Sequence, residues 1–385
     1  MNEIIAYGKQ SVSEADIEAV EKILRSDYLT QGPTVPAFER AVASKCNSQF
    51  AVAVNSATSA LHIACLALGV SSGDTVWTCS NTFVASANCA LYCGASIDFV
   101  DIEHDTWCLS PKKLKQKLET HQSLGKPLPK VVIPVHLTGQ SCDMREIYKL
   151  GQDFGFRIIE DASHAIGGRY VDNPVGNCRY SDITVFSFHP VKIITSGEGG
   201  MALTNDPKLF ERMRRLRIHG IVNDPKKMQK EVVEPWYYEQ VDLGFNYRMT
   251  DIHAALGLSQ LNQVDNFVKK RNELAERYEK LIKNLPLKTQ CVPKNVFSAR
   301  HLFVTRTSQD LHLKLFNRLR NAGIIVHLHY MPVYMHPFYQ KLGFQEGYNP
   351  EAEAYAKEAI TLPLYPTLTL KQQDRVISIL ESELG

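Results

Sequence analysis

Apolar runs rich in β-branched residues alternate with amphipathic stretches up to about residue 250. The runs that read as strands are Ala51 to Val54, Val131 to His136, Arg157 to Asp161 and Ile183 to Ser187. Two stretches between or before them read as helices, because Ser13 to Leu24 opens with Ser-x-x-Asp and Ser59 to Leu68 is almost wholly apolar. This alternation predicts an α/β fold built on a mostly parallel sheet.

The pattern changes after Asp251. From Ile252 through Leu285 the sequence has long helical periodicity with Lys, Glu and Arg on its outer face. We expect a smaller α/β domain to follow, with strands at Leu302 to Thr305 and Ile324 to His329 and a closing helix from Leu370 to Leu384. The predicted division is therefore a large domain over residues 1–250 and a small domain over residues 251–385.

Composition and charge exclude several classes of protein. The chain of 385 residues is 44% hydrophobic and 22% charged with a formal charge of +2, so no global field indicates a nucleic-acid or membrane binder. Neither a signal peptide nor a spanning apolar segment is evident, and we expect a cytoplasmic protein. The nine cysteines show no C-x-x-C spacing, which indicates reduced thiols rather than a disulfide framework or a zinc site.

Chemistry-bearing residues follow two of the predicted strands. Asp161 and His164 come directly after one apolar run, and Lys192 follows the next, just before the glycine-rich stretch Ser196 to Gly200. Taken singly, such a lysine is usually a surface charge and such an aspartate a helix cap. Together they match the needs of pyridoxal phosphate, which requires a lysine for its aldehyde and a carboxylate for its ring nitrogen. Asn55 to Ser59, at the start of a predicted helix, offers a phosphate cradle.

Several ordered motifs resemble the DegT/StrS-type sugar-nucleotide aminotransferases, a branch of the fold type I pyridoxal-phosphate enzymes. They are NSATSALH, TFVASAN, VIPVHLTGQ, EDASHAIG, SFHPVKIITSGEGG and GFNYRMTDIHAALGLSQL, spread over nearly the whole chain. The resemblance implies a large domain with a mostly parallel seven-stranded sheet and a smaller C-terminal α/β domain. It also implies pyridoxal 5′-phosphate as cofactor, with pyridoxamine phosphate as its amino-carrying form.

The resemblance assigns roles to individual residues. Lys192 is implied as the catalytic lysine that binds the cofactor covalently, Asp161 as the partner of the pyridine nitrogen, and His164 as a neighbour of the phenolic oxygen. Other implied cofactor contacts are the ring-stacking Phe83 and the phosphate-binding Ala57, Thr58, Ser187 and Asn246. Because the family's counterpart of Asn246 reaches the neighbouring subunit's site, a homodimer with shared active sites is expected. The individual roles of Arg217, His219 and Arg248 stay open.

Within the family, details of the sequence resemble the aminotransferases of the pseudaminic acid pathway. The implied substrate is UDP-2-acetamido-2,6-dideoxy-β-L-arabino-hex-4-ulose, a UDP-linked keto sugar that would be aminated at C4 with L-glutamate as donor. The residues implied to bind this substrate are Tyr7, Asp27, Tyr28, Leu29, Thr30, Ala57, Ser187, Asn246, His329, Tyr330, Met331 and Pro332.

Four alternatives remain to be weighed. An aminotransferase for another nucleotide-linked keto sugar, GDP- or dTDP-linked, is the nearest, and only substrate trials separate it. The family's dehydratase branch has histidine in place of Lys192, and a ligand-sensing regulator would need a DNA-binding module that the chain lacks. A nicotinamide dehydrogenase would need a G-x-G-x-x-G motif after a strand. We expect no metal site, since no carboxylate or cysteine lies close in sequence to the pair His327 and His329.

Overall fold

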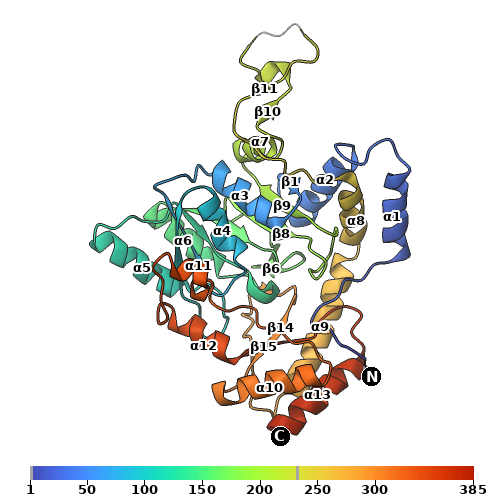
Figure 1. Cartoon of the computed structure of the whole chain (residues 1–385), viewed down its shortest axis with the longest axis vertical. Helices are drawn as coiled ribbons and strands as arrows, with labels where there is room; N and C mark the ends of the chain where they lie inside the picture. Colours follow the sequence, from blue (N-terminus) through green and yellow to red (C-terminus); the bar gives the residue numbers. More distant parts are fainter. Residues whose placement is uncertain (1–2, 231–233) are drawn as a thin grey trace.

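The computed structural model describes residues 3–230 and 234–385. Its centre is a seven-stranded sheet in the order β1-β9-β8-β5-β4-β2-β3 (Figure 1). Only β9 is antiparallel to its neighbours, β1 and β8, so the other six strands run in one direction. The predicted mostly parallel α/β sheet is confirmed. The strands are β1 (Phe50–Val54), β2 (Thr75–Cys79), β3 (Ser96–Val100), β4 (Val131–Ile133), β5 (Arg157–Asp161), β8 (Ile183–Ser187) and β9 (Gly200–Thr204).

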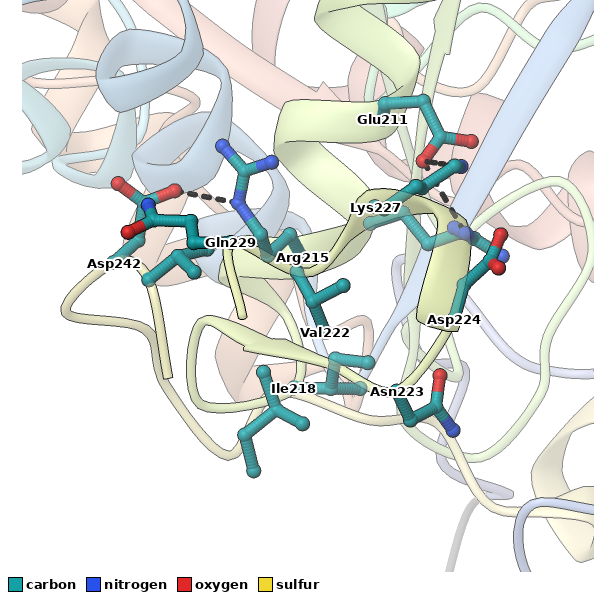
Figure 2. A pocket seen from close by; sticks show the side chains of 12 residues that line it. Glu211, Arg215, Ile218, Val222, Asn223, Asp224, Lys227, Gln229 and Asp242 are labelled. Carbon is teal, nitrogen blue, oxygen red and sulfur yellow. Dashed lines mark hydrogen bonds and ion pairs between the residues drawn. The ribbon is translucent and has the colours of Figure 1, made fainter. Parts of the chain in front are cut away.

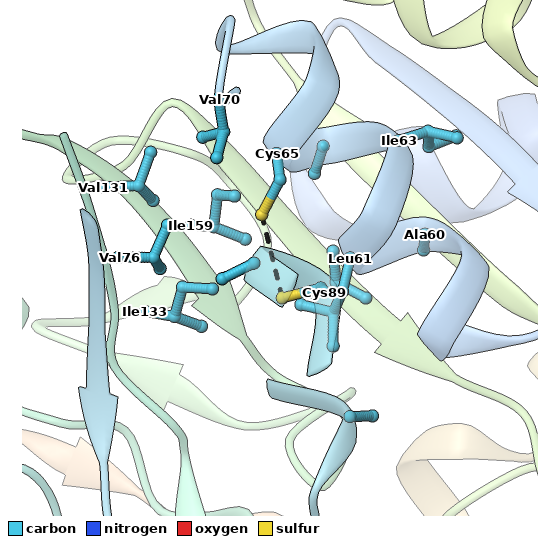
Figure 3. Close-up of a cluster of buried hydrophobic side chains, with 14 of the residues drawn as sticks. Ala60, Leu61, Ile63, Cys65, Val70, Val76, Cys89, Val131, Ile133 and Ile159 are labelled. Carbon is cyan, nitrogen blue, oxygen red and sulfur yellow. Dashed lines mark hydrogen bonds between the residues drawn. The ribbon is translucent and has the colours of Figure 1, made fainter. Parts of the chain in front are cut away.

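Helices cover both faces of this sheet because alternate strand residues point to opposite sides. In β1, Val52 and Val54 join one core with α3, α4 and α7, whereas Ala51 and Ala53 join a second core with α2 and α8. Figure 3 shows the first core, where α3 side chains face apolar side chains of β2, β4 and β5. The helices of this region are α1 (Glu14–Leu24), α2 (Thr34–Cys46), α3 (Ala57–Ala67), α4 (Ala85–Tyr92), α5 (Pro111–Ser123), α6 (Met144–Phe154) and α7 (Pro207–Leu216).

The two helices predicted before residue 70 are confirmed, and the reason for the first is visible. Ser13 caps α1 by accepting a hydrogen bond from the backbone N–H of Asp16, whose carboxylate accepts one from the backbone of Ser13 in return. Asp16 is also fixed by the side-chain amide of Gln260 on α8, and α1 packs against α8. The opening helix is thus held by a polar anchor rather than by an apolar stripe.

The long helical periodicity after Asp251 corresponds to two helices, α8 (Asp251–Leu261) and α9 (Val264–Leu281). The two helices differ in what they pack against. The helix α8 lies against α1 and α2, with Gly257 so close to the Phe38 ring that an added Cβ would lie 2.6 Å from it. The helix α9 continues into a different core, to which it contributes Leu274 and Tyr278. The first turns of α9 still pack in the same core as α8, through Val264, Phe267 and Val268.

The C-terminal part is built on a three-stranded antiparallel sheet in the order β12-β14-β15, comprising β12 (Lys288–Thr289), β14 (Phe303–Arg306) and β15 (Ala359–Leu362). Its helices are α10 (Gln309–Asn321), α11 (Pro337–Gln340), α12 (Pro350–Glu358) and α13 (Leu370–Leu384), the last as predicted. The N-terminal Ile5 is buried in this core. The division into domains at residue 250 stays a prediction.

The strand expected at Ile324 to His329 is wrong. This segment makes only two single-residue bridges, Ile324 with Ile5 and His327 with Thr361. Between them the backbone N–H of Val326 donates to the carbonyl of Ile324, a tight turn that moves the chain from one partner to the other. The segment therefore crosses between two parts of the small core instead of extending a sheet.

The remaining short elements lie at the periphery. They are β6 (Arg169–Tyr170), β7 (Asn173–Pro174) and β13 (Val296–Phe297), which form a small sheet, and the hairpin of β10 (Ile221–Val222) and β11 (Glu239–Gln240). The hairpin extends away from the body of the molecule at the top of Figure 1. Within residues 3–230 and 234–385, every helix is too short or too polar to cross a bilayer.

Candidate active site

The predicted site residues gather at the carboxyl edge of the sheet. Strand β5 ends at Asp161 and β8 ends at Ser187, and the two strands are parallel, with Asp161 paired in register with Val185. The turn from β1 into α3 opens at the same edge. Because the ends of parallel strands meet there, residues far apart in sequence face one space. Sequence spacing alone placed each residue at a strand end, and the sheet order brings the ends together.

Asp161 is a buried carboxylate in a fixed position. Its Oδ2 accepts a hydrogen bond of 2.6 Å from the hydroxyl of Ser86, and its Oδ1 accepts one of 3.1 Å from the backbone N–H of Ser163. Ser86 lies on α4 and was not expected from the sequence. Ser86 belongs to the TFVASAN motif, so the motif indicated that this segment lies near the site. The spacing of the motif gave no reason to choose the Ser86 hydroxyl over other side chains of the segment.

Lys192 follows β8 and faces the same space. Burial lowers the pKa of its amine to about 8, and the negative charge of Asp161 opposes that shift only in part. Across the described ranges, the Lys192 amine forms no hydrogen bond or ion pair. A half-buried amine with a lowered pKa and no partner suits a nucleophile and base. The position and electrostatics of Lys192 are those that an aldehyde-binding lysine requires.

The N-terminus of α3 offers a cradle for an anion. Ser56 caps the helix, and the backbone N–H groups of its first turn, at Ala57 and Thr58, point along the positive end of the helix dipole. Gly200 of β9 pairs with Val54 on one side and with Ser187 on the other, so the end of β8 lies one strand away from this turn. A Cβ on Gly200 would lie 2.4 Å from the backbone nitrogen of Ala57, so the close approach needs glycine at this position.

Aromatic and imidazole rings form a wall beside these groups. Phe83 is 58% exposed, and its ring centre lies 6.3 Å from that of Tyr330, so one face of Phe83 is free to stack. The hydroxyl of Tyr330 lies 3.4 Å from Nε2 of the buried His164, whose Nδ1 has no partner among the described atoms. Burial, aided by the charge of Lys192, holds the pKa of His164 well below its usual range. His164 is therefore a neutral imidazole.

His301, which the sequence analysis missed, packs its ring 4.4 Å from that of His164. Burial and the nearby His164 and Lys192 keep the pKa of His301 well below the usual range. The carbonyl of His301 accepts a hydrogen bond of 3.1 Å from Arg271, a fully buried arginine on α9. Burial lowers the pKa of Arg271 to about 9. Nothing in the sequence separated Arg271 from the charged residues on the outer face of the same helix.

Tyr7 lies in front of a pair of histidines from the C-terminal part. Its ring centre is 5.0 Å from that of His329 and 5.4 Å from that of His327. Nδ1 of His329 is engaged by the hydroxyl of Thr361 at 2.9 Å, and burial next to His327 and Lys192 lowers the pKa of His329 to about 3. The described part of the chain contains no cluster of three groups able to hold a metal ion. Met331 is at the surface and Pro332 is buried behind it.

The structure does not bring every predicted substrate residue into this group. Asp27, Tyr28, Leu29 and Thr30 are exposed, and among the described residues no hydrogen bond, ion pair or aromatic contact joins them to Lys192. They are held instead next to the start of α8, where the backbone of Asp251 donates to the Leu29 carbonyl. Asn246 is also exposed. Its side chain forms no hydrogen bond within the described ranges, and its predicted role stays a prediction.

The three basic residues whose roles were open differ in their surroundings. Arg217 is tied down, since its guanidinium donates to the carboxylate of Glu39 at 2.5 Å and to the carbonyl of Ala53 at 2.7 Å. His219 is exposed with a positive φ of 65°. The backbone of Arg248 pairs with Val54 at the end of β1, so this residue lies close to the turn that opens α3. Of the three, Arg248 is the one positioned near the anion cradle.

Two cavities lie at different distances from this cluster along the chain, one lined by Lys192 and one by residues of the β10–β11 hairpin. A narrow pocket beside Lys192 is lined by Lys9, Pro190, Thr195, Gln260 and Arg271. A larger cavity of about 370 Å³ lies at the base of the β10–β11 hairpin and shares no lining residue with it (Figure 2). The charged groups of that cavity pair with one another, Arg215 with Asp242 and Lys227 with Glu211. We assign it no part in the chemistry.

The family model of the DegT/DnrJ/EryC1/StrS aminotransferases matches residues 10–381. A UDP-4-amino-4,6-dideoxy-N-acetyl-beta-L-altrosamine transaminase from Campylobacter jejuni is 36% identical over 98% of both chains. The solved structure of Helicobacter pylori PseC, an aminotransferase of pseudaminic acid biosynthesis, matches with a TM-score of 0.89 and 29% identity over 99% of both chains. The PMP form of Spr1654 from Streptococcus pneumoniae matches with a TM-score of 0.88 and 30% identity over 98% of both chains.

The residues of this chain fit the cofactor of that family. Pyridoxal phosphate needs suitable groups around its aldehyde, ring nitrogen and phosphate. This chain offers the partnerless amine of Lys192, the fixed carboxylate of Asp161, the free N–H groups at the start of α3 and the unpaired Nδ1 of the buried His164. The chain belongs to the DegT/DnrJ/EryC1/StrS aminotransferase family and is a pyridoxal-phosphate-dependent sugar aminotransferase.

Proposed function

We propose that the enzyme transfers an amino group from L-glutamate to C4 of UDP-2-acetamido-2,6-dideoxy-β-L-arabino-hex-4-ulose, in pseudaminic acid biosynthesis. The name of the C. jejuni transaminase contains the UDP-linked 4-amino sugar that this reaction would form, and the name of H. pylori PseC contains the pathway. Their similarity extends over both the large and the small part of the chain.

The observation that carries the proposal is the uncharged, ring-lined wall beside Lys192. His164, His301 and His329 are all buried imidazoles with pKa values lowered well below neutrality, and Tyr330 and Tyr7 lie next to them. Neutral rings and hydroxyls suit the faces and hydroxyl groups of a sugar.

The cofactor supplies an electron sink that makes removal of a proton from carbon feasible. This chain's residues supply the rest in the proposal. Asp161 keeps the ring nitrogen protonated, and its own hydrogen bonds from Ser86 and Ser163 fix it in place. The Lys192 amine takes the proton from the α-carbon of glutamate and, in the second half-reaction, delivers a proton to C4 of the sugar. A pKa of about 8 keeps a useful fraction of this amine neutral near pH 7.

The phosphate of the cofactor is assigned to the α3 N-terminus, through Ala57, Thr58 and the Ser187 hydroxyl. Phe83 is assigned to stack on the ring, since one of its faces is exposed. The exposed Asn246 is assigned to the site of a second copy, in a homodimer. The exposed segment Asp27 to Thr30 is assigned, with Tyr7, Met331 and Pro332, to the sugar nucleotide.

The test is a substrate panel followed by mass spectrometry of the products. The purified enzyme would be given L-glutamate with the UDP-linked 4-keto sugar, and separately with GDP- and dTDP-linked keto sugars. The proposal predicts a 4-amino product from the UDP sugar, with at least about tenfold higher kcat/KM than with the others, the effect of roughly one good hydrogen bond. Amination of a GDP- or dTDP-linked sugar in preference would replace this substrate and leave the aminotransferase assignment intact.

A further inference from the structure

The buried imidazole of His164 has one ring nitrogen engaged and one without a partner. His164 follows Asp161 by three residues at the carboxyl edge of the sheet, and it is 4% exposed. Its Nε2 lies 3.4 Å from the hydroxyl of Tyr330, whereas Nδ1 is shielded from solvent and forms no hydrogen bond with any described residue. A buried polar atom without a partner costs free energy. The partner of Nδ1 is therefore expected from a bound molecule.

The neighbouring His301 does not supply this partner. Its ring centre lies 4.4 Å from that of His164, and the two ring planes are tilted by 49°. Nδ1 of His301 is itself buried and unpaired within the described ranges. The two imidazoles therefore pack on each other without a hydrogen bond between these two nitrogen atoms.

The hydroxyl of Tyr330 is held in place and has His164 as its partner. The carbonyl of the preceding residue, His329, accepts a hydrogen bond of 2.7 Å from the hydroxyl of Tyr355, which fixes the backbone next to Tyr330. The centre of the Tyr330 ring lies 6.2 Å from that of His164 and 6.3 Å from that of Phe83. Among the described residues, the Tyr330 hydroxyl forms no hydrogen bond other than the one with Nε2 of His164. Its single hydrogen is thus available to that nitrogen.

The direction of this hydrogen bond follows from what each arrangement leaves unpaired. If Nε2 of His164 carried the hydrogen and donated it to Tyr330, the phenolic hydrogen would lack an acceptor and Nδ1 would lack a donor. If Tyr330 donates instead, the N–H of Nδ1 is the one donor left without a partner. Burial raises the pKa of Tyr330 and lowers the pKa of His164, so the phenol keeps its hydrogen and the neutral imidazole carries one. Donation by Tyr330 therefore leaves fewer groups unpaired.

We propose that Tyr330 is a positioning residue that fixes the tautomer of His164, so that Nδ1 carries the hydrogen and donates it to an anionic oxygen of the bound cofactor. The phenolic oxygen of pyridoxal phosphate, which the family resemblance places beside His164, is an acceptor of this kind. An N–H donor stabilises negative charge on that oxygen, whereas the other tautomer would turn a lone pair toward it. This role of Tyr330 rests on the place of His164 beside the cofactor, and it is independent of the identity of the sugar nucleotide.

The first test reads the tautomer directly, by nitrogen NMR of the full-length enzyme with isotope-labelled histidines, before and after pyridoxal phosphate is added. The chemical shifts of the two ring nitrogens show which one carries the hydrogen, and the His164 signals are identified by their loss in His164→Gln. We expect the hydrogen on Nδ1 in the wild type and a mixture of tautomers in cofactor-free Tyr330→Phe, which keeps the ring but removes the hydroxyl. The matched control Tyr339→Phe removes a hydroxyl that bonds to Asn88 and should leave the His164 signals unchanged. A hydrogen on Nε2 in the wild type, or an unchanged tautomer in Tyr330→Phe, would overturn the proposal.

The second test asks whether the hydroxyl of Tyr330 acts on the cofactor through His164. The visible absorbance of the lysine-bound cofactor is followed against pH, and Tyr330→Phe should raise the midpoint of this titration by at least about 0.5 pH unit, because the phenolic oxygen loses a reliable donor. Glutamine at position 164 offers an amide donor that has no tautomers. In a His164→Gln background, Tyr330→Phe should therefore leave the midpoint unchanged. An equal shift in both backgrounds, or no shift in the wild-type background, would refute the role of Tyr330. Preference for another sugar in the substrate panel would leave both readouts as they are.

Discussion

The substitution Gly200→Ala tests whether the backbone around α3 forms the anion cradle. The added Cβ would lie 2.4 Å from the Ala57 nitrogen and 2.5 Å from the carbonyl carbon and oxygen of Ser56. Ordinary contact begins at 3.4 Å, so the first turn of α3 must move away from β9 by about 1 Å. All three atoms are backbone, and no side-chain rotation relieves the clash.

The expected loss has two parts. Forcing a methyl group into a filled space costs about 1–3 kcal/mol of folding free energy. Moving the N–H groups by about 1 Å also weakens at least one hydrogen bond to the phosphate, worth roughly 1.5–3 kcal/mol, which corresponds to a rise in the dissociation constant of about 10- to 100-fold. The cofactor contribution should therefore be separable from the stability loss.

The assay is a titration of the apo-enzyme with pyridoxal phosphate, followed by the visible absorbance of the lysine-bound cofactor, together with urea unfolding of the apo-enzyme. Gly8→Ala is the matched control, because its Cβ would meet Val191 at an ordinary 3.5 Å on the other side of the same site. It should leave both quantities within about 0.5 kcal/mol of wild type. Wild-type affinity for the cofactor in the Gly200→Ala variant would refute the cradle.

Four further changes test the remaining assignments. Lys192→Ala should abolish turnover while leaving circular dichroism and the unfolding curve unchanged, and retained transamination by this variant would contradict the role of Lys192. In the wild type, the rate of covalent cofactor uptake should rise with pH through about 8, where the Lys192 amine loses its proton. When Lys192→Ala and Asn246→Ala subunits are mixed, about a quarter of wild-type activity should return if each site takes Asn246 from the other subunit. Half of the randomly formed dimers are then hybrids, and each hybrid has one intact site out of two. No recovery would place both residues in one subunit's site. Glu160→Gln should destabilise the enzyme by about 1–3 kcal/mol at pH 7 in urea unfolding. Burial alone raises the pKa of Glu160, but hydrogen bonds from His136 and two hydroxyls lower it. The stabilisation by the Glu160 carboxylate is therefore present above the unfolded-state pKa and should vanish as the pH falls through the folded-state pKa. His301→Ala should raise KM for the sugar more than it lowers kcat, because it removes the neutral ring that packs on His164; an unchanged KM would show that this packing does not position His164.

The linear sequence was informative wherever a local signal has a local cause. The capping pattern at Ser13 gave the start of α1, and the apolar runs gave β5 and β8 with their boundaries. The motif segments also identified Lys192 and Asp161, because ordered motifs at strand ends fix both the residue type and its place at the sheet edge. The role expected of each of these two residues could therefore be inferred from its place in a motif.

Prediction from the sequence failed where a residue's surroundings come from distant parts of the chain. Arg271 reads as one more outer-face charge, yet the meeting of α9 with the carbonyls of His301 and Leu364 buries it. His301 gave no signal, because only the approach of the C-terminal part to the large sheet puts its ring beside His164. The approach of Cys65 to Cys89, at 3.7 Å, also gave no signal, since spacing along two separate helices does not reveal how those helices pack.

The sequence by itself therefore determined most of the helices and strands of the large sheet, the place of Lys192 and Asp161 after strand ends and the family of the enzyme, because helix periodicity, strand runs and motifs depend on neighbours within a few residues. The tertiary structure decided the break between α8 and α9, the crossing path of residues 324–329, and the lowered pKa values of His164, Lys192 and His301. Desolvation and charge act through space over several ångströms, and the groups that exert them on these three side chains are brought close only by the packing of the whole chain.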